Sequence, residues 1–407
     1  MTVRILAGDC RETLRGLPDN SVHMVCTSPP YWNLRSYLPA GHPDKALEIG
    51  SEATPEAFVQ TMVDVFREVR RVLRPDGVCW MNMGDSYATG TTAARNPTTT
   101  KGADVPASWS GRSQPERCGT PAGYKTKDLL MLPARVALAL QSDGWWVRSE
   151  IIWAKPNPMP ESATDRPTNA HEKVFLLTKS ASYFYDAHAI REARTSDEDG
   201  AGFRGGSYVG GKVDNTTLGK REAVGNTRVN PESGRNCRNV WTIATQSFSG
   251  SHFATMPAAL VERCILAGTS AAGCCPSCGA PWERIVENGE PDEAARRACG
   301  ADASGGYSGT STKGHAAAGV QDASAVKARI LAGMVVKRTV GWKATCSCPE
   351  HKPVPCTVLD PFGGAGTTSL VSERLGRNSI MCELNSDYRD MARQRITGDA
   401  PLFASVA

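Results

Sequence analysis

Four consecutive residues, Ser28-Pro29-Pro30-Tyr31, combine chemical groups that could hold a planar molecule bearing an amino group. A serine hydroxyl and backbone carbonyls can accept the hydrogens of an amine, and an aromatic ring can stack on a planar face. Trp32 offers a second aromatic face. Because proline has no N–H and constrains the residue before it, the prolines fix the loop that follows the apolar run 22–26. Taken alone, this pattern is more typical of a proline-rich turn at a strand end.

A second ligand-binding pattern, residues 360–368, lies near the C-terminus. The apolar run 356–359 precedes it and the helical pattern 369–375 follows it, which predicts a strand, a glycine-rich turn and a helix. The next strand, 379–382, ends at Glu383, whose carboxylate could accept hydrogen bonds from ribose hydroxyls. The turn has neither the glycine spacing of a dinucleotide site nor the lysine of a P-loop, so neither of those sites fits well.

Together, the two motifs resemble those of the amino-group DNA methyltransferases that use S-adenosylmethionine. The catalytic motif, Ser28-Pro29-Pro30-Tyr31, comes before the cofactor motif, Asp360-Pro361-Phe362-x-Gly364-x-Gly366-Thr367-Thr368, and this is the permuted order of the family's β group. The resemblance implies an α/β, Rossmann-like fold with a mostly parallel twisted sheet. It also implies that the cofactor, S-adenosylmethionine, is bound by Asp9, Asp360, Pro361, Phe362, Gly364, Gly366, Thr367, Thr368 and Glu383.

The N-terminal strand, 3–6, would lie beside the strand that ends at Glu383 in a permuted fold of this kind. Asp9 could then reach the adenine side of the cofactor. An equally weighted alternative is that Asp9 only caps a helix over 11–17.

The elements between the motifs alternate as in a mostly parallel sheet, which places ligands at the carboxyl ends of the strands. Thr54 and Pro55 begin a helix with an apolar stripe, residues 74–77 predict a turn, and residues 78–83 predict a buried strand. Further along, we expect a helix over 132–140 and strands over 145–153 and 173–178.

In the family, the proline-rich loop after the strand 145–153 lies near the flipped base, so Lys155 and Asn157 are candidate base contacts. Turn chemistry explains these two residues nearly as well. His171-Glu172 also resembles a family segment, but a lone pair of this kind is more often structural than catalytic.

Two long segments have no apolar periodicity. Residues 86–127 hold six Lys or Arg against two acidic residues, a net charge of +4 that equals that of the whole chain. Such a mobile basic loop would suit phosphate contacts on DNA, and the alternative is a solvated insertion without a binding role. Residues 192–238, rich in Gly, Arg and Asn, occupy the place of target recognition in the β group. Arg and Asn are side chains that read base edges.

Two cysteine pairs in the C-terminal half have the spacing of a structural zinc site. The four thiolates expected to bind the metal are those of Cys275, Cys278, Cys346 and Cys348. The second pair is Cys-x-Cys, so three alternative ligands remain, namely Cys274, His351 and Cys356. Four protein ligands leave no open position, which favours a structural role. Between the pairs, residues 294–325 are rich in Ala, Gly and Ser and predict a flexible excursion.

The composition sets the broad class of the protein. A chain of 407 residues, 40% of them hydrophobic, can bury a large core, and no segment is long and apolar enough to span a membrane. There is no signal-peptide pattern, and fourteen cysteines without a disulfide framework favour reduced thiols, so we expect a cytoplasmic protein. We expect a catalytic half over 1–185, target recognition over 186–245, a cofactor-binding half over 246–272 and 354–400, and a zinc-ribbon-like insertion over 273–353.

We therefore expect methylation of double-stranded DNA at the N4 amine of a flipped-out cytosine, because family members with Ser at position 28 usually modify this atom. The alternative is N6 of adenine, with the same fold and residues. Two other classes are less favoured. One is a protein glutamine methyltransferase, a family that has the motif Asn-Pro-Pro-Tyr and the cofactor motif before it. The other is a non-enzymatic zinc-ribbon DNA-binding protein. A homodimer and a cognate restriction endonuclease are further candidate partners.

Overall fold

The structure is a computed structural model that describes residues 1–34, 36–39, 41–88, 120–192, 236–246, 255–291, 335–349, 352–399 and 405–406. It divides into two compact units. The first unit comprises Met1–Asp186, Arg238–Glu283 and Ala344–Ala407, and the second comprises Ala187–Cys237 and Arg284–Lys343. None of the helices in these described ranges is both long and apolar enough to cross a membrane.

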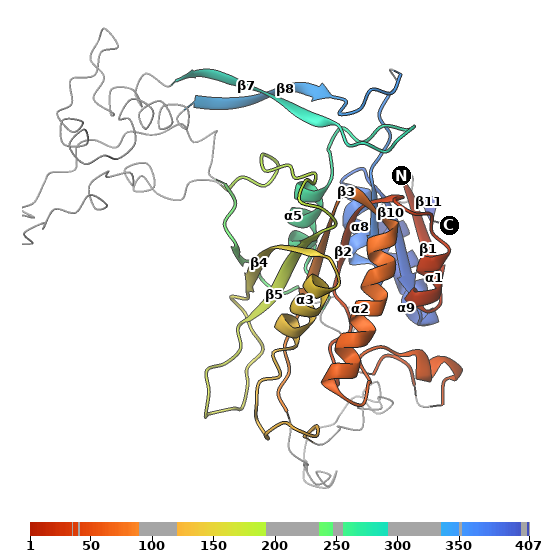
Figure 1. The fold of residues 1–407 in the computed structure, drawn as a ribbon, viewed down its shortest axis with the longest axis vertical. Helices are drawn as coiled ribbons and strands as arrows, with labels where there is room; N and C mark the ends of the chain where they lie inside the picture. Colours follow the sequence, from red (N-terminus) through yellow and green to blue (C-terminus); the bar gives the residue numbers. More distant parts are fainter. Residues whose placement is uncertain are drawn as a thin grey trace, which may run out of the picture. The chain divides into compact units, whose positions relative to one another are not determined.

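A nine-stranded sheet forms the centre of the first unit, in the order β11-β1-β10-β9-β2-β3-β5-β4-β6 (Figure 1). Its strands are β1 (Thr2–Ala7), β2 (Val22–Thr27), β3 (Leu73–Met83), β4 (Trp146–Ala154), β5 (His171–Thr178), β6 (Val240–Thr242), β9 (Thr357–Asp360), β10 (Asn378–Glu383) and β11 (Ser405–Val406). Every neighbouring pair is parallel except the two made by β5, which runs antiparallel to β3 and β4. The expected α/β class with a mostly parallel sheet is therefore confirmed.

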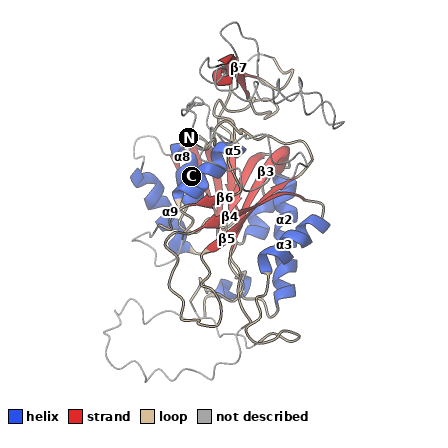
Figure 2. Cartoon of the chain, turned by 90° about the vertical axis from the view of Figure 1, so that its left-hand side faces the viewer, coloured by secondary structure: helices blue, strands red, loops and turns tan. Residues whose placement is uncertain are grey.

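Helices cover both faces of this sheet, with α2 and α3 on one side and α8 and α9 on the other (Figure 2). The helices of the first unit are α1 (Cys10–Arg15), α2 (Pro55–Val72), α3 (Leu132–Ser142), α5 (Ala258–Gly268), α8 (Thr367–Arg374) and α9 (Ser386–Asp399), with a short 3-10 helix η1 (Pro43–Leu47). Helix α2 begins as the sequence predicts, because the Thr54 side chain accepts a hydrogen bond from Ala57 N at 3.1 Å and Pro55 follows. Its apolar stripe, from Phe58 to Val72, is buried in the core.

Strand pairing confirms the permuted arrangement expected for the N-terminal strand. β1 lies parallel to β10, with Ala7 opposite Glu383, and Gly8 N donates to the Glu383 carbonyl at 3.1 Å. β9 lies between β10 and β2. The carboxyl ends of the strands that carry both motifs therefore meet at one edge of the sheet.

The prediction of a turn over residues 74–77 is wrong, because β3 runs from Leu73 to Met83 without interruption. Val22 pairs with Leu73 and Met24 pairs with Val78, so the register shifts where β3 has extra residues. The residues typical of a turn instead make an irregularity within the strand, since strand pairing continues on both sides of them.

The second unit contains a two-stranded ribbon formed by β7 (Glu283–Pro291), whose first residue belongs to the first unit, and β8 (Val335–Lys343). The two arrows run in opposite directions in Figure 1. Arg284 on β7 contacts two residues of β8. Its guanidinium donates to Thr339 Oγ1 at 2.9 Å and lies 4.5 Å from the centre of the Trp342 ring. Most of the predicted basic loop, the recognition segment and the Ala/Gly/Ser-rich excursion lie outside the described residues, at 89–119, 193–235 and 292–334.

Candidate active site and metal centre

A cavity of about 940 Å³ lies at the carboxyl ends of the strands that carry the two motifs. Most of the catalytic and cofactor-binding residues expected from the sequence line it, namely Asp9, Ser28, Pro29, Pro30, Tyr31, Asp360, Pro361, Phe362, Gly364, Thr367 and Glu383. The other two, Gly366 and Thr368, are not in its lining. The chain thus brings together residues that lie more than three hundred positions apart in the sequence.

Glu383, at the end of β10, faces this cavity with its carboxylate held in place. Its Oε2 accepts from Gly364 N at 2.7 Å, and its Oε1 accepts from Asn385 N at 2.8 Å. Burial raises the pKa of this carboxyl group. Because each oxygen has two lone pairs and uses one for these backbone groups, both oxygens can still accept a hydrogen bond from a ligand hydroxyl.

The glycine-rich turn between β9 and α8 presents bare backbone to the cavity. Gly364 has a φ of 50°, and a Cβ built there would meet no atom within 4 Å. Gly366 has a different role, because its added Cβ would lie only 2.8 Å from the Ala392 Cβ on α9. The Thr368 hydroxyl donates to the Cys26 carbonyl at 3.1 Å, so it ties α8 to β2 rather than facing a ligand.

Asp360 joins the two motifs directly. It is 2% exposed, and its Oδ1 accepts from Thr27 Oγ1 at 2.7 Å and from Phe362 N at 3.1 Å. Burial raises the pKa of this carboxyl group. The hydrogen bond to Thr27 fixes the last residue of β2, which directly precedes Ser28, relative to the glycine-rich turn.

Asp9 caps a helix, as one of the two alternatives expects, and it also lines the cavity. Its Oδ1 accepts from Arg11 N at 2.8 Å at the start of α1, and its carboxylate also accepts from the Arg11 guanidinium. Contact between Asp9 and the adenine of the cofactor stays a prediction.

Tyr31 is held by hydrogen bonds at one end and by backbone packing along its ring. Its hydroxyl donates to Glu172 Oε2 at 2.7 Å and accepts from Asn82 Nδ2 at 3.0 Å. A Cβ on Gly84 would lie 2.6 Å from Tyr31 Cε2, so the ring rests against a glycine backbone. Burial and the nearby Glu172 carboxylate raise the pKa of the phenol well above its usual value.

Trp32 does not offer the second aromatic face expected from the sequence. Its side chain is 3% exposed, and its indole N–H donates to the Glu52 carbonyl at 2.8 Å. The expectation was wrong because Trp32 packs into the core behind the loop, among apolar residues that include Phe58 and Met62.

Glu172 and Asn82 are members of the site that sequence reasoning missed as functional residues. Asn82 Nδ2 donates to Glu172 Oε2 at 2.8 Å, and Lys155 Nζ forms an ion pair with Glu172 Oε1. Lys155 also lies 4.6 Å from the centre of the Trp153 ring. The only sequence signal for Glu172 was the pair His171-Glu172, which precedes the predicted strand 173–178. It became informative only when β5 placed the carboxylate beside Tyr31.

The two candidate base contacts, Lys155 and Asn157, line the cavity but already have protein partners. Lys155 pairs with Glu172, whereas Asn157 Oδ1 accepts from Thr245 N at 2.9 Å. Asn157 therefore joins the proline-rich loop after β4 to the segment that follows β6.

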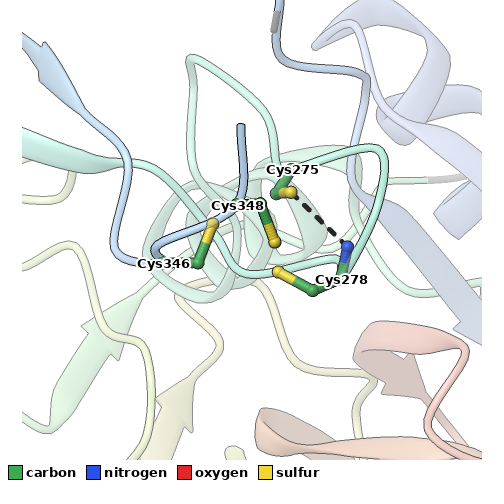
Figure 3. A group of neighbouring side chains, drawn as sticks. All are labelled: Cys275, Cys278, Cys346 and Cys348. Carbon is green, nitrogen blue, oxygen red and sulfur yellow. Dashed lines mark hydrogen bonds between the residues drawn. The ribbon is translucent and has the colours of Figure 1, made fainter. Parts of the chain in front are cut away.

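Four cysteine sulfurs gather just before β7 and just after β8, and we call this part of the chain the neck of the insertion (Figure 3). The sulfurs of Cys275, Cys278, Cys346 and Cys348 all lie within 4.8 Å of one another. Cys278 N donates to Cys275 Sγ at 3.4 Å, which folds the first pair into a knuckle. Four thiolates at such spacing fit a tetrahedral zinc ion.

Two of the alternative metal ligands, Cys274 and Cys356, lie in a separate cluster with His23. Thr357 N lies 3.0 Å from His23 Nδ1, and His23 Nε2 lies 3.0 Å from the Gly279 carbonyl oxygen. Both ring nitrogens are thus taken up by backbone groups, which does not fit metal binding by this histidine. The third alternative, His351, lies outside the described residues.

The chain is similar to known DNA methyltransferases over most of its length. A model of DNA methylases that act on N6 and N4 amino groups matches residues 22–274 and 355–394, and the chain belongs to this family. Type II methyltransferase M.SmaI from Serratia marcescens is 31% identical over 393 residues, which cover 97% of this chain and 90% of the relative. Type II methyltransferase M.Cfr9I from Citrobacter freundii is 40% identical over 265 residues, covering 65% of this chain and 72% of the relative.

Two solved structures are more distantly similar. The cytosine-N4-specific PvuII DNA methyltransferase has 14% identity and a TM-score of 0.48, covering 100% of this chain and 95% of that chain. The DNA modification methylase TTHA0409 from Thermus thermophilus, in complex with S-adenosylmethionine, has 20% identity and a TM-score of 0.45, covering 99% of this chain and 97% of that chain. The family membership and the geometry described above, rather than these two structures, define an S-adenosylmethionine-dependent DNA methyltransferase.

Proposed function

We propose that this DNA methyltransferase modifies the N4 amine of a cytosine that is flipped out of the double helix at a specific sequence. The observation that carries the proposal is that the Ser28–Tyr31 loop and the Glu383–Gly364 pair line one cavity. A loop suited to holding an amine and a turn suited to holding a nucleoside thus face the same space. Ser at position 28 supports cytosine over adenine, because family members with this residue usually modify N4.

The donor nucleoside fits the cofactor side of the cavity. Glu383 retains free lone pairs for ribose hydroxyls, and the bare backbone at Gly364 leaves room for close approach. When bound there, S-adenosylmethionine supplies a methyl group on a positively charged sulfur, which makes that carbon electrophilic. Pro361, Phe362 and Thr367 would complete the wall of this site.

The chain's own residues prepare the target amine. Its lone pair is delocalised into the base, so the amine is a poor nucleophile. Ser28 Oγ and the Pro29 carbonyl would accept its two hydrogens and draw the nitrogen toward tetrahedral geometry, which frees the lone pair. The exposed side of the Tyr31 ring would stack on the flipped base and hold it in line with the methyl donor.

Three further roles belong to this proposal. The relatives' designation as type II methyltransferases supports a place in a restriction-modification system, with a cognate endonuclease as the functional partner. The segment 186–245 would provide target recognition, and a structural zinc ion would be bound by the four cysteines 275, 278, 346 and 348.

The test is to incubate the purified protein with plasmid DNA and labelled S-adenosylmethionine, digest the DNA and identify the labelled nucleoside by mass spectrometry. We expect N4-methylcytosine. N6-methyladenine would agree with the proposed active site but would contradict the choice of cytosine as the target base. Label in protein rather than DNA would favour a glutamine methyltransferase.

Two variants test the loop itself. Ser28→Ala and Tyr31→Ala should each lower methyl transfer by about 100-fold or more, because both remove groups that orient the amine. DNA binding should persist in both variants. The matched control is Ser142→Ala, which removes an exposed hydroxyl at the end of α3 that donates to the Leu138 carbonyl. Normal methylation by Tyr31→Ala would contradict the stacking role.

A further inference from the structure

A continuous line of hydrogen bonds leads from the amine-binding loop to a carboxylate. Ser28 Oγ donates to Tyr31 Oη at 3.4 Å, and Tyr31 Oη donates to Glu172 Oε2 at 2.7 Å. Both hydroxyl hydrogens thus point toward Glu172. The remaining lone pairs of Ser28 Oγ are left to accept a hydrogen from the target amine.

Asn82 fixes the direction of this line. Its Nδ2 lies 2.8 Å from Glu172 Oε2, 3.0 Å from Tyr31 Oη and 3.4 Å from Ser28 Oγ. The opposite orientation of the amide would place its oxygen against a carboxylate oxygen, where neither atom has a hydrogen to donate. The amide group therefore donates toward Glu172, and the carboxylate is the acceptor at the end of the line.

Glu172 is also shielded and electrically balanced. Its side chain is 16% exposed, and that of its ion-pair partner Lys155 is 18% exposed. A cation stabilises a carboxylate that is shielded from water in this way. Lys155 supplies that cation through the other carboxylate oxygen, Oε1, and so leaves Oε2 free to face Tyr31.

We propose that Glu172 is the terminal proton acceptor of the methylation reaction and that it receives the proton through Ser28 and Tyr31. The inference rests on the proposed function, since it requires an exocyclic amine at Ser28. It assigns a catalytic part to Tyr31 that is separate from stacking, because the hydroxyl carries the proton while the ring holds the base.

The transfer balances in atoms and charge. The amine nitrogen forms a bond to the methyl carbon as the carbon–sulfur bond breaks, with the bonding electrons remaining on sulfur, so the positive charge passes to nitrogen. One N–H bond breaks in the same step, and its electrons stay on nitrogen as the neutral methylamine. Its proton goes to Ser28 Oγ, the serine proton goes to Tyr31 Oη, and the tyrosine proton goes to Glu172 Oε2, which becomes a neutral carboxyl group.

The acidity of the groups agrees with this direction. A protonated exocyclic amine is a strong acid, because deprotonation restores delocalisation into the ring, so even a lysine-paired carboxylate can accept its proton. The pKa of Tyr31 lies well above its usual value because of burial and the adjacent carboxylate. The phenol therefore remains protonated at neutral pH and passes a proton on only as it receives another.

Two conservative variants separate this relay from a purely structural role. Tyr31→Phe keeps the stacking ring and removes only the hydroxyl. Glu172→Gln keeps an oxygen that can accept from Tyr31 and is much less able to take up a proton. The matched control is Glu150→Gln, because Glu150 forms another lysine–carboxylate pair across β4 and β5, with Lys173 at 2.9 Å, away from the lining of the cavity.

The measurement is the rate of a single turnover of methyl transfer to plasmid DNA, in light and heavy water, with enzyme in excess. We expect Glu172→Gln and Tyr31→Phe each to slow the reaction by about 100-fold. The double variant should be no slower than the slower single one. Wild type and Glu150→Gln should show the same solvent isotope effect, and the two relay variants should lose or change it.

Several results would overturn the relay. A wild-type rate in Glu172→Gln, or a wild-type reaction that is insensitive to heavy water, would show that the proton leaves directly to solvent. Affinities for S-adenosylmethionine and DNA, measured by titration calorimetry, should be unchanged in both relay variants, and a loss of either would point to misplaced binding residues instead. If wild type labels no nucleoside at all, the proposed function itself fails, whereas labelled DNA with unaffected variants refutes only the relay.

Discussion

The contact between Tyr31 and Gly84 shows how a single missing side chain shapes the site. Gly84 follows β3 directly, and Tyr31 Cε2 occupies the space that a Cβ at this position would need. With one side of the ring against this backbone and the hydroxyl bonded to Glu172 and Asn82, the ring has little freedom to rotate. If a base stacks on this ring as proposed, the ring is already in position, which lowers the cost of ordering it.

Gly84→Ala should therefore impair methylation without unfolding the protein. The added carbon would meet Tyr31 ring atoms at 2.6 and 3.1 Å, so the ring must move. A displacement of roughly 1 Å near reacting groups can cost about 100-fold in rate. The control is Gly398→Ala in α9, where an added Cβ meets nothing within 4 Å. Single-turnover rates and circular dichroism check both variants, and a normal rate in Gly84→Ala would contradict a fixed ring.

Individual residues also show where sequence reasoning succeeds and where it stops. The position of Ser28–Tyr31 follows from local chemistry, because consecutive prolines end a strand wherever they occur. The part played by Glu172 depends on a partner 141 positions away in the chain, and no local pattern encodes that pairing. The burial of Trp32 was missed for the same reason, since an indole can face a ligand or the core equally well.

At the scale of elements, the site depends on the joining of β2 to β9. Val25 pairs with Leu359, and the Thr27 hydroxyl reaches the Asp360 carboxylate at the ends of these strands. Both Thr27 and Asp360 are buried. The hydrogen bond therefore couples the loop after β2 to the glycine-rich turn after β9.

Thr27→Val should weaken this coupling while keeping the shape of the side chain. Loss of the hydroxyl leaves the buried carboxylate one donor short, which costs about 1 to 3 kcal/mol. Urea unfolding should show that loss, and the affinity for S-adenosylmethionine should fall with it. Thr61→Val, which removes a hydroxyl bonded to the Ala57 carbonyl within α2, serves as the control. An unchanged urea midpoint in Thr27→Val would mean that strand pairing alone holds the two motifs together.

The position of Glu383 at the end of β10 should make the proposed cofactor binding sensitive to pH. Burial raises the pKa of its carboxyl group, so protonation occurs at a higher pH than in an exposed glutamate. The carboxylate is the form that accepts from two ligand hydroxyls, so affinity for S-adenosylmethionine should fall as the solution becomes mildly acidic. Calorimetry across this range should show that Glu383→Gln binds more weakly but with most of the pH dependence removed. Glu12→Gln on the exposed side of α1 should behave as wild type.

Most elements of the sheet and its helices could be predicted, because their apolar periodicity and caps are local features. The irregular part of β3 could not be, because residues 74–77 have the composition of a turn and are kept within the strand only by pairing on either side. β6 could not be predicted either. It is a three-residue strand, and its place at the edge of the sheet depends on hydrogen bonding to β4.

At the scale of the whole chain, the neck of the insertion is fastened to the methyltransferase core by several independent contacts. Cys274 and Val354 exchange backbone hydrogen bonds of 2.8 and 2.9 Å. The knuckle also contacts the beginnings of two core strands, because Arg74 donates to the Cys278 carbonyl at 2.6 Å. His23 meets the Gly279 carbonyl at 3.0 Å. A metal ion in the four-cysteine cluster would close this neck covalently and leave the cavity untouched.

Zinc should therefore affect stability rather than the methyl-transfer step. We expect purified protein to contain about one zinc ion per chain by plasma mass spectrometry, as four thiolates require. Cys278→Ser should lose the metal and lower the urea midpoint, because a site with three thiolates binds zinc more weakly and the insertion is no longer closed. Cys237→Ser, outside the cluster, should retain both. Below its unfolding transition, metal-free Cys278→Ser should still transfer methyl groups at close to the wild-type single-turnover rate. A metal-free wild type of full stability would show that the four thiols pack without an ion, and a folded variant without activity would show that the neck positions the active site.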